Sequence, residues 1–210
     1  MTETAQSAPA GRGVRLPRTA RRAQLLAAAQ DVFVANGYHA AAMDEIAERA
    51  GVSKPVLYQH FPGKLELYMA LLESHVDQLV GQVRQAIASS PDNKQRVRAT
   101  VAAFYDFVDG EGQAFRMVFE SDLRSEPAVL EVVERATTDS VDAITDTITA
   151  DAGLPPDRAR LLAVGLVGLS QVTARAWLAD GRKVPKDDAV ALISNLTWRG
   201  IGGGFPLQQH

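Results

Sequence analysis

Apolar residues along most of the chain recur at intervals of three, four and seven positions, the spacing that places them on one face of an α-helix. The pattern is clearest in one stretch, at Leu67, Leu71, Leu72, Val76, Leu79, Val83 and Ile87. No segment combines β-branched residues with strict alternation of apolar and polar positions, so the sequence predicts no strand. The expected fold class is all-α.

Clusters of glycine, proline and serine interrupt these amphipathic stretches and divide the chain into helix-length segments. We expect about nine helices, over residues 19–36, 43–50, 54–60, 63–89, 92–109, 111–121, 126–151, 156–180 and 186–201. Thr19 is the expected N-cap of the first helix, and Asn36-Gly37 suits its C-terminal end. The helix over 63–89 would be roughly 40 Å long, enough to connect two parts of the molecule.

Two short helices with a glycine between them form the most informative stretch, residues 43–61. A helix-turn-helix needs a small residue where its helices touch and a residue that tolerates positive φ in the turn, and Ala47 and Gly51 meet these needs. The apolar residues available to pack on a supporting helix are Ile46, Val52, Val56 and Leu57. Ser53 is the expected N-cap of the second helix, with Pro55 in its first turn.

Polar side chains remain on the outer face of this second helix. They are Lys54, Tyr58, Gln59 and His60. Tyrosine and lysine bond phosphate oxygens, while lysine, glutamine and histidine also reach base edges. Any corner between two helices can contain a small residue and a glycine, so these outer residues are what favours DNA binding over simple packing.

The distribution of charge supports this interpretation, although the net charge is −3. Residues 1–64 contain eight basic and five acidic side chains, whereas the remainder contains fourteen basic and twenty acidic ones. The basic residues that precede the helix-turn-helix are Arg12, Arg15, Arg18, Arg21 and Arg22. A basic arm in this position is expected to contact phosphates or a minor groove.

Composition disfavours an enzyme. The chain has no cysteine, which excludes disulfides, thiolate zinc sites and cysteine nucleophiles. The histidines, His39, His60, His75 and His210, show no metal-ligand spacing, and residues 168–172 match a nucleophile elbow incompletely. We therefore predict no catalytic residue, metal or cofactor. The absence of an export signal and of an uninterrupted apolar run of about 18 residues predicts a cytoplasmic protein without a membrane partner.

Residues 51–67, together with Phe33, Gly37-Tyr38 and Ile46-Ala47, resemble the signature of the TetR family of bacterial regulators. The resemblance covers roughly residues 20–70. It implies a two-fold dimer bound to a palindromic operator. It also implies a C-terminal domain that binds a small molecule.

The same resemblance implies that Tyr58 and Lys64 contact phosphates and that Lys54 and its neighbours face the groove. The complete set of expected DNA contacts is Arg12, Arg15, Arg18, Arg21, Arg49, Ser53, Lys54, Pro55, Val56, Tyr58, Gln59, His60 and Lys64. Ala41 and Ala42 stand where the family commonly has threonine, which removes a cap and a phosphate contact. Acidic residues in the first turn of the next helix partly compensate through the helix dipole.

Residues 37–41 and 164–169 resemble, within the family, regulators of fatty-acid synthase genes that respond to long-chain acyl-CoA. This resemblance implies an apolar or amphipathic effector, such as long-chain acyl-CoA. The expected ligand-binding residues are Leu72, Val76, Leu79, Val83, Ile87, Phe104, Phe107, Val108, Phe115, Phe119, Leu166, Leu169 and Trp177. Each of them could instead fill the core. A polar headgroup could contact Arg116, Glu120, Asp122 and Arg124, which a solvated charged face explains equally well.

Small residues along the helix over 156–180 permit close approach of another helix, and the family resemblance places a four-helix dimer bundle here. The expected interface residues are Gly165, Gly168, Ala174, Val190, Ile193, Leu196 and Trp198. Ordinary packing within one chain is the alternative.

The expected organisation has four parts: a basic arm (1–17), a helix-turn-helix domain (18–64), an effector-binding and dimerisation domain (65–202) and a loose tail (203–210). The alternative function is an architectural DNA-binding protein that coats DNA through charge. A palindrome-selective footprint would separate a regulator from such a protein.

Overall fold

The computed structural model describes residues 16–110, 123 and 125–200. Most of the expected arm, the expected helix over 111–121 and the expected tail lie outside the described residues. The same holds for Arg12, Arg15, Phe115, Arg116, Phe119, Glu120, Asp122 and Arg124.

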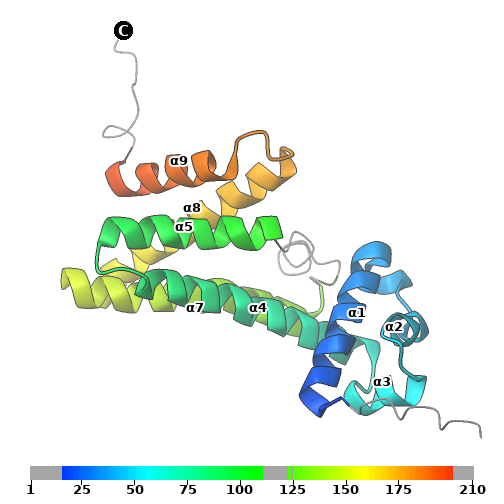
Figure 1. Cartoon of the computed structure of the whole chain (residues 1–210). Coiled ribbons are helices and arrows are strands. Elements are labelled where there is room, and N and C mark those ends of the chain that lie inside the picture. Colours follow the sequence, from blue (N-terminus) through cyan, green and yellow to red (C-terminus); the bar gives the residue numbers. More distant parts are fainter. Residues whose placement is uncertain (1–15, 111–122, 124, 201–210) are drawn as a thin grey trace, which may run out of the picture.

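Eight helices and no strand make up the described residues, which confirms the predicted all-α class. The helices are α1 (Arg18–Ala40), α2 (Met43–Arg49), α3 (Lys54–His60), α4 (Lys64–Ala88), α5 (Asn93–Gly110), α7 (Pro127–Ala152), α8 (Pro156–Ala179) and α9 (Lys186–Arg199). We call α1 to α3 the head and α4 to α9 the body (Figure 1).

A shared apolar core joins the three helices of the head. Leu25, Ala29 and Phe33 of α1 are buried against Ile46 of α2 and Leu57 of α3. Burial of such side chains is the main driving force for bringing short helices together, since helices of seven residues are not stable alone.

Two glycines with positive φ shape the head. Gly51, with a φ of 63°, forms the turn between α2 and α3, where the Val52 N–H donates to the Ala47 carbonyl oxygen at 3.0 Å. Gly37, with a φ of 74°, interrupts α1 and redirects its last residues up to Ala40. A larger residue would be strained at either position.

The N-cap of α1 lies two residues before the predicted one. The helix begins at Arg18 with Pro17 in the N-cap position, whereas Thr19 was the expected N-cap. The ring of Pro17 holds φ at −53°, close to the helical value, so the helix can begin directly after it.

Long helices are stacked in layers to form the body. Helix α4 packs against α1, α5 and α7, while α5 packs against α8 and α9. In Figure 1, α9 lies over α5 and α8, which lie over α4 and α7, and the head sits at one end of α4. Helix α4 has 25 residues and, at about 1.5 Å per residue, runs from the head along most of the body.

Candidate functional site

Helix α3 buries one side against the head and exposes the other. Leu57 is fully buried, whereas Tyr58 is 44% exposed and Lys54, Pro55 and Gln59 are exposed as well. In helix-turn-helix proteins, the second helix lies in the major groove and its outward side chains contact base edges. Helix α3 has this form.

Side-chain hydrogen bonds fix α2, which supports α3, on α1. The Gln24 amide of α1 donates to the Ala50 carbonyl oxygen, just after α2, at 2.8 Å. Arg49, at the end of α2, donates to Asp31 of α1 from two guanidinium nitrogens, at 2.7 and 3.0 Å. Arg49, one of the expected DNA contacts, therefore has a carboxylate partner within the head.

The Lys54 ammonium lies 2.5 Å from a carboxylate oxygen of Asp44 in the first turn of α2. The hydrogen bond to Asp44 is the largest of the causes that raise the pKa of Lys54 above its ordinary value. Both side chains are more than half exposed, at 54% and 62%. Because exposed ion pairs are weak, a phosphate or base edge can replace Asp44 as the partner of Lys54.

Other expected DNA contacts are exposed or half-buried. Arg18 is exposed at the start of α1, and Ser53 is the exposed N-cap of α3, where its hydroxyl makes no capping hydrogen bond. Arg21, Val56 and His60 are half-buried. The Arg21 guanidinium donates to the Gln24 side-chain oxygen at 2.8 Å.

Lys64, the first residue of α4, points back to the end of α1. Its ammonium donates to the carbonyl oxygens of Tyr38, His39 and Ala41, at 2.8, 3.1 and 2.9 Å. In this structure its contacts lie at the junction of head and body.

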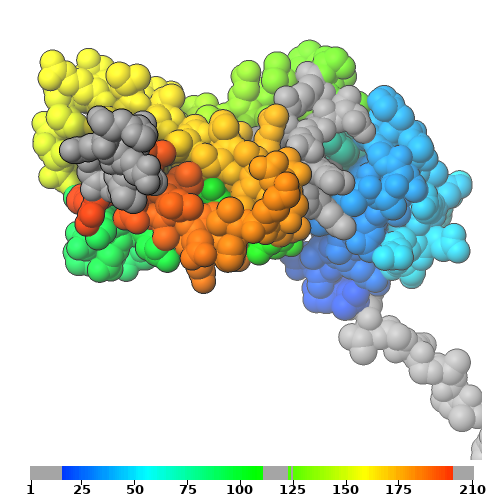
Figure 2. All heavy atoms as spheres, turned by 90° about the horizontal axis from the view of Figure 1, so that it is seen from above, coloured from blue at the N-terminus to red at the C-terminus, as the bar shows by residue number. Residues whose placement is uncertain are grey.

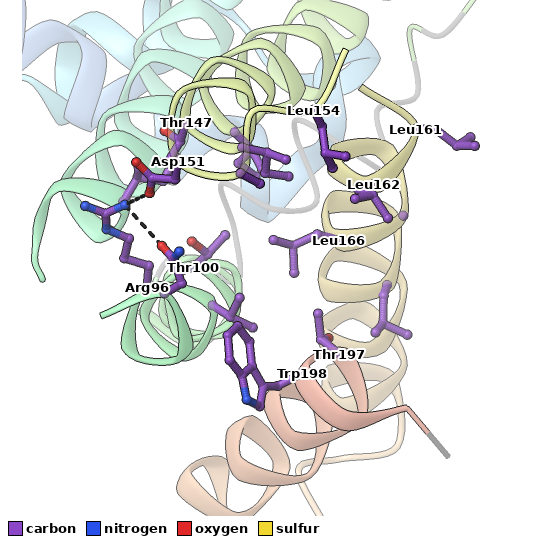
Figure 3. Close-up of a pocket in the computed structure, with 18 residues that line it drawn as sticks. Arg96, Thr100, Thr147, Asp151, Leu154, Leu161, Leu162, Leu166, Thr197 and Trp198 are labelled. Carbon is purple, nitrogen blue, oxygen red and sulfur yellow. Dashed lines mark hydrogen bonds and ion pairs between the residues drawn. The ribbon is translucent and has the colours of Figure 1, made fainter. Parts of the chain in front are cut away.

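A cavity of about 560 Å³ lies in the body, formed by the last turn of α4, helices α5, α7, α8 and α9, and the α7–α8 connection (Figure 3). Most of its lining is apolar, contributed by Ile87, Val97, Ile144, Ile148, Leu154, Leu161, Leu162, Leu166, Leu169 and Trp198. Pockets that hold small ligands are commonly about 300–1,000 Å³ and mainly apolar, so size and chemistry suit a ligand.

Polar side chains of the cavity gather at one edge. Arg96 of α5 forms an ion pair with Asp151 of α7 and donates to the Asn93 side-chain oxygen at 3.2 Å. Its Nε also donates to the Ser90 carbonyl oxygen. Figure 3 shows this edge facing the wall that contains Leu166. The positive charge of Arg96 already has a carboxylate partner, so a ligand meets an apolar wall and a neutralised edge.

Known proteins share both parts of this architecture. Residues 25–71 match the family described as bacterial regulatory proteins, tetR family. The transcriptional activator FasR of Mycolicibacterium smegmatis is 55% identical over 196 residues, which cover 92% of this chain and 90% of FasR. The chain belongs to the TetR family. It is a DNA-binding, ligand-responsive transcriptional regulator, as the resemblance of residues 51–67 predicted.

Solved structures show how far the fold of this TetR-family regulator is shared. A TetR-like regulator from Rhodococcus sp. RHA1 is 28% identical, with a TM-score of 0.69 over 90% of this chain and all of that one. FadR from Bacillus subtilis, solved with stearoyl-CoA, is 20% identical, with a TM-score of 0.67 over 85% of this chain and 98% of FadR.

The residues of the regulator that were expected to bind a ligand fall into three groups. Ile87, Leu166 and Leu169 line the cavity. Trp177 lies beside a smaller cavity of about 180 Å³, and its Nε1 donates to the Val184 carbonyl oxygen at 2.7 Å. The other described ones are buried in the core: Leu72, Val76, Leu79, Val83, Phe104, Phe107 and Val108.

Several cavity residues were not expected from the sequence. Ile144 and Ile148 come from α7, and Leu161 and Leu162 from the start of α8. The two leucines are 74% and 55% exposed. The sequence contained a signal for Leu161 and Leu162, because the apolar residues at the start of α8 cover a wider face of the helix than packing on the core requires.

Helix α8 of the regulator leaves an apolar face uncovered by the described part of the chain. Leu161, Val164 and Val172 are 74%, 48% and 67% exposed. Figure 2 shows parts of α8 and α9, in yellow to red, on the outer face of the body. By length and composition alone, α8 is also apolar enough to cross a membrane, and 28% of its most apolar stretch is buried. An apolar face of this kind favours a binding partner.

The expected dimer residues differ in their exposure. Gly165 is exposed and Gly168 half-buried, and a Cβ at either position would meet no atom within 4 Å. Trp198 is 47% exposed and, like Gly165, also lines the cavity. Ile193 and Leu196 are half-buried, whereas Ala174 and Val190 are buried within the chain.

Proposed function

We propose that this regulator binds a palindromic operator as a dimer, and that a ligand with a long acyl chain, such as long-chain acyl-CoA, controls its affinity for DNA. The observation that carries the proposal is the apolar cavity of about 560 Å³ in the body. Genes of lipid metabolism are the expected targets. The expected compartment is the cytoplasm, where operator DNA is accessible.

The chemistry of the cavity favours a chain over a compact polar ligand. Burial of each methylene contributes about 0.8 kcal/mol, so a chain of about sixteen carbons binds tightly even after ordering costs. A free carboxylate would have to compete with Asp151 for Arg96, whereas a thioester brings no charge to this edge. Affinity should therefore rise with chain length and be greater for acyl-CoA than for the free acid.

A structural match and a sequence match support this ligand class. FadR of Bacillus subtilis binds stearoyl-CoA within the same fold. The fatty acid metabolism regulator protein of Bacillus subtilis is 24% identical over 88 residues, which cover 42% of this chain. At these identities the matches support only the ability of this fold to bind an acyl-CoA. The contacts proposed here rest on the residues of this cavity.

Helix α4 is the proposed connection between ligand and DNA. Ile87 in its last turn lines the cavity, while its first residue, Lys64, contacts the head. The two positions are about 35 Å apart along the helix. A ligand that favours one tilt of α4 therefore changes the spacing of the two heads in a dimer, and spacing decides whether both fit successive major grooves.

The dimer is proposed to form through the exposed faces of α8 and α9. Val164, Val172 and Leu192 are 48%, 67% and 49% exposed, and Gly165 and Gly168 have open space beside them for a second helix. Burial of this face on a second copy removes apolar surface from water.

The proposed DNA contacts are carried by the arm and the exposed side of the head. Phosphate contacts are assigned to Arg12, Arg15, Arg18, Arg21, Arg49, Ser53, Tyr58 and Lys64. Base-edge contacts are assigned to Lys54, Pro55, Val56, Gln59 and His60. The proposed domain boundaries are those expected from the sequence, with the DNA-binding domain ending at residue 64.

Operator selection from genomic DNA with the purified protein tests DNA recognition. The regulator should enrich palindromic sites and protect two half-sites about one helical turn apart. Uniform coating of DNA without sequence preference would instead establish the architectural alternative.

Titration of acyl-CoAs of increasing chain length against the operator complex tests ligand recognition. The expected result is a change in operator affinity that grows with chain length, with free coenzyme A and short-chain acyl-CoAs having little effect. No response at any length, in protein shown to bind its operator, would exclude this ligand class.

A further inference from the structure

The described residues leave the cavity of the body open between α8 and α9. Several of the residues that line it there are also exposed on the surface. We call them the rim, which consists of Leu161, Leu162, Gly165 and Trp198. In Figure 3, Leu161 points away from the cavity on the outer side of α8, whereas Leu166 points into it. The rim therefore belongs both to the cavity and to the outer surface of the body.

Along α8 the rim continues as an apolar stripe. Leu161, Gly165, Gly168 and Val172 follow one another at intervals of four, three and four residues, which places them on the same face of the helix. Residues 161–174 contain no charged side chain. A Cβ at Gly165 or Gly168 would meet no atom within 4 Å, so a second helix can approach this face closely. The rim and the proposed dimer face are thus parts of one surface.

A second copy of the chain suits this surface. In a two-fold dimer the same patch of each copy meets the other, so an apolar, uncharged stripe lies against an identical one. Val164 and Leu192 add exposed apolar side chains on α8 and α9. With α8 of the second copy over the rim, an acyl chain in the cavity is shielded from water on the side that the described residues leave open.

From this continuity we infer that the ligand site is completed by the second copy of the chain, whose α8 covers the rim and contacts the bound acyl chain. The inference rests on the dimer and the acyl ligand proposed above. Its consequence is that ligand and second copy share a contact. Each must then strengthen the binding of the other by the same factor, because coupling between two binding events is reciprocal.

Subunit exchange tests this coupling in the full-length protein. Dimers carrying a donor fluorophore are mixed with dimers carrying an acceptor, and energy transfer reports how fast the subunits dissociate. Saturating palmitoyl-CoA should slow exchange about tenfold, within the usual range of coupling between two sites, and free coenzyme A should have little effect. Unchanged exchange in protein shown to bind palmitoyl-CoA would overturn the inference and leave the proposed function intact. Absence of palmitoyl-CoA binding would contradict both.

Two exposed leucines provide a matched pair of variants. Leu161→Asn should remove most of the slowing by palmitoyl-CoA, because a polar amide at the rim disfavours burial of the chain against the second copy. Leu130→Asn should preserve the slowing, since Leu130 is exposed on α7 and lies outside the lining of the cavity. The quantity compared is the ratio of exchange rates with and without ligand, so a weaker dimer alone does not alter the result. An equal ratio in the two variants would count against a contact at the rim.

Photolabelling tests whether the second copy touches the ligand directly. Mixed dimers are prepared from an unsubstituted copy and an isotope-labelled Leu166→Asn copy, whose own cavity should bind the chain weakly. Acyl-CoAs with a diazirine at successive positions of the chain are bound and irradiated. Mass spectrometry should find the adduct in residues 161–175 of the Leu166→Asn copy, at a level well above that in Leu166→Asn homodimers. Adducts confined to the unsubstituted copy, whether in its cavity or in its residues 201–210, would show that each chain covers its own ligand and would overturn the inference.

Discussion

The head and the body are built from similar amphipathic helices but leave different surfaces open. The head exposes polar side chains on α3, and its cations at Arg49 and Lys54 are paired with carboxylates. The body instead exposes large apolar side chains along α8 and contains an apolar cavity. The exposed ion pairs of the head are weak enough for the proposed phosphate and base contacts to replace them, whereas the proposed partners of the body are an apolar ligand and a second copy of the chain.

A substitution at Phe104 tests whether this residue of the body fills the core or lines the ligand site. This side chain is 3% exposed and lies in the core. Phe104→Ala should lower the free energy of unfolding by about 3–5 kcal/mol, because a buried ring leaves a cavity. Urea unfolding at one protein concentration measures the change, with Leu130→Ala at an exposed position of α7 as the control. Normal stability with a lost ligand response would place Phe104 in the ligand site.

The head and the body also differ in how well the sequence predicts them. The helix-turn-helix lies within residues 43–61, where spacing alone decides which residues pack, turn or face outward. Its core residue Leu57 and its turn residue Gly51 are placed as predicted. The predicted α1 end at Asn36-Gly37 coincides with the interruption of the helix, which continues to Ala40 after it.

Apart from Ile87, Leu166 and Leu169, the cavity residues were not identified in the same way, because the cavity draws on five helices distant in the sequence. Phe104 and Ile144 occupy equivalent apolar positions on amphipathic helices, yet only Ile144 lines the cavity. The choice depends on how α5, α7 and α8 are placed relative to one another. Likewise Ala174 is fully buried and Val172 is 67% exposed, although both lie in the same apolar segment.

Gly168 tests whether the exposed face of α8 is a dimer interface. Gly168→Leu meets no atom of its own chain at Cβ, so the fold of one chain should tolerate it. A large side chain there should separate two helices in close contact and weaken the dimer. Operator affinity should then fall about a hundredfold, because the second half-site is no longer bound from the same complex.

Sedimentation and operator binding measure these two effects. Gly81→Leu is the matched control, since Gly81 lies within α4 and its Cβ would also meet no atom within 4 Å. A Gly168→Leu protein that remains a dimer of undiminished affinity would show that the interface lies elsewhere.

Leu166 tests the cavity without disturbing the head. Its side chain is half-buried and lines the cavity from α8. Leu166→Asn should lower affinity for a sixteen-carbon acyl-CoA about tenfold, because a polar amide would be buried beside the chain without a partner. Operator affinity without ligand should stay unchanged, and Leu130→Asn should affect neither. Equal loss of operator affinity without ligand would mean that the substitution acts through folding.

The smallest expected effect concerns an ion-pair cluster of the body, which contrasts with the replaceable pairs of the head. Asp109 at the end of α5 accepts from Lys186 of α9 at 3.1 Å and from Arg182 at 2.9 Å. The hydrogen bond from Lys186, followed by that from Arg182, holds the pKa of Asp109 below its ordinary value of 3.8. A lowered pKa in the folded state means that the pair stabilises the protein above pH 3.8 and that this contribution is lost as pH falls through the lowered pKa.

All three side chains are at least 32% exposed, so Asp109→Asn should cost less than about 1 kcal/mol at neutral pH. The Tm difference from the unsubstituted protein should shrink as the pH is lowered below 3.8, while Asp146→Asn, at an exposed position of α7, should show little difference at any pH. A difference that grows on acidification would show that Asp109 stabilises the fold by something other than its charge.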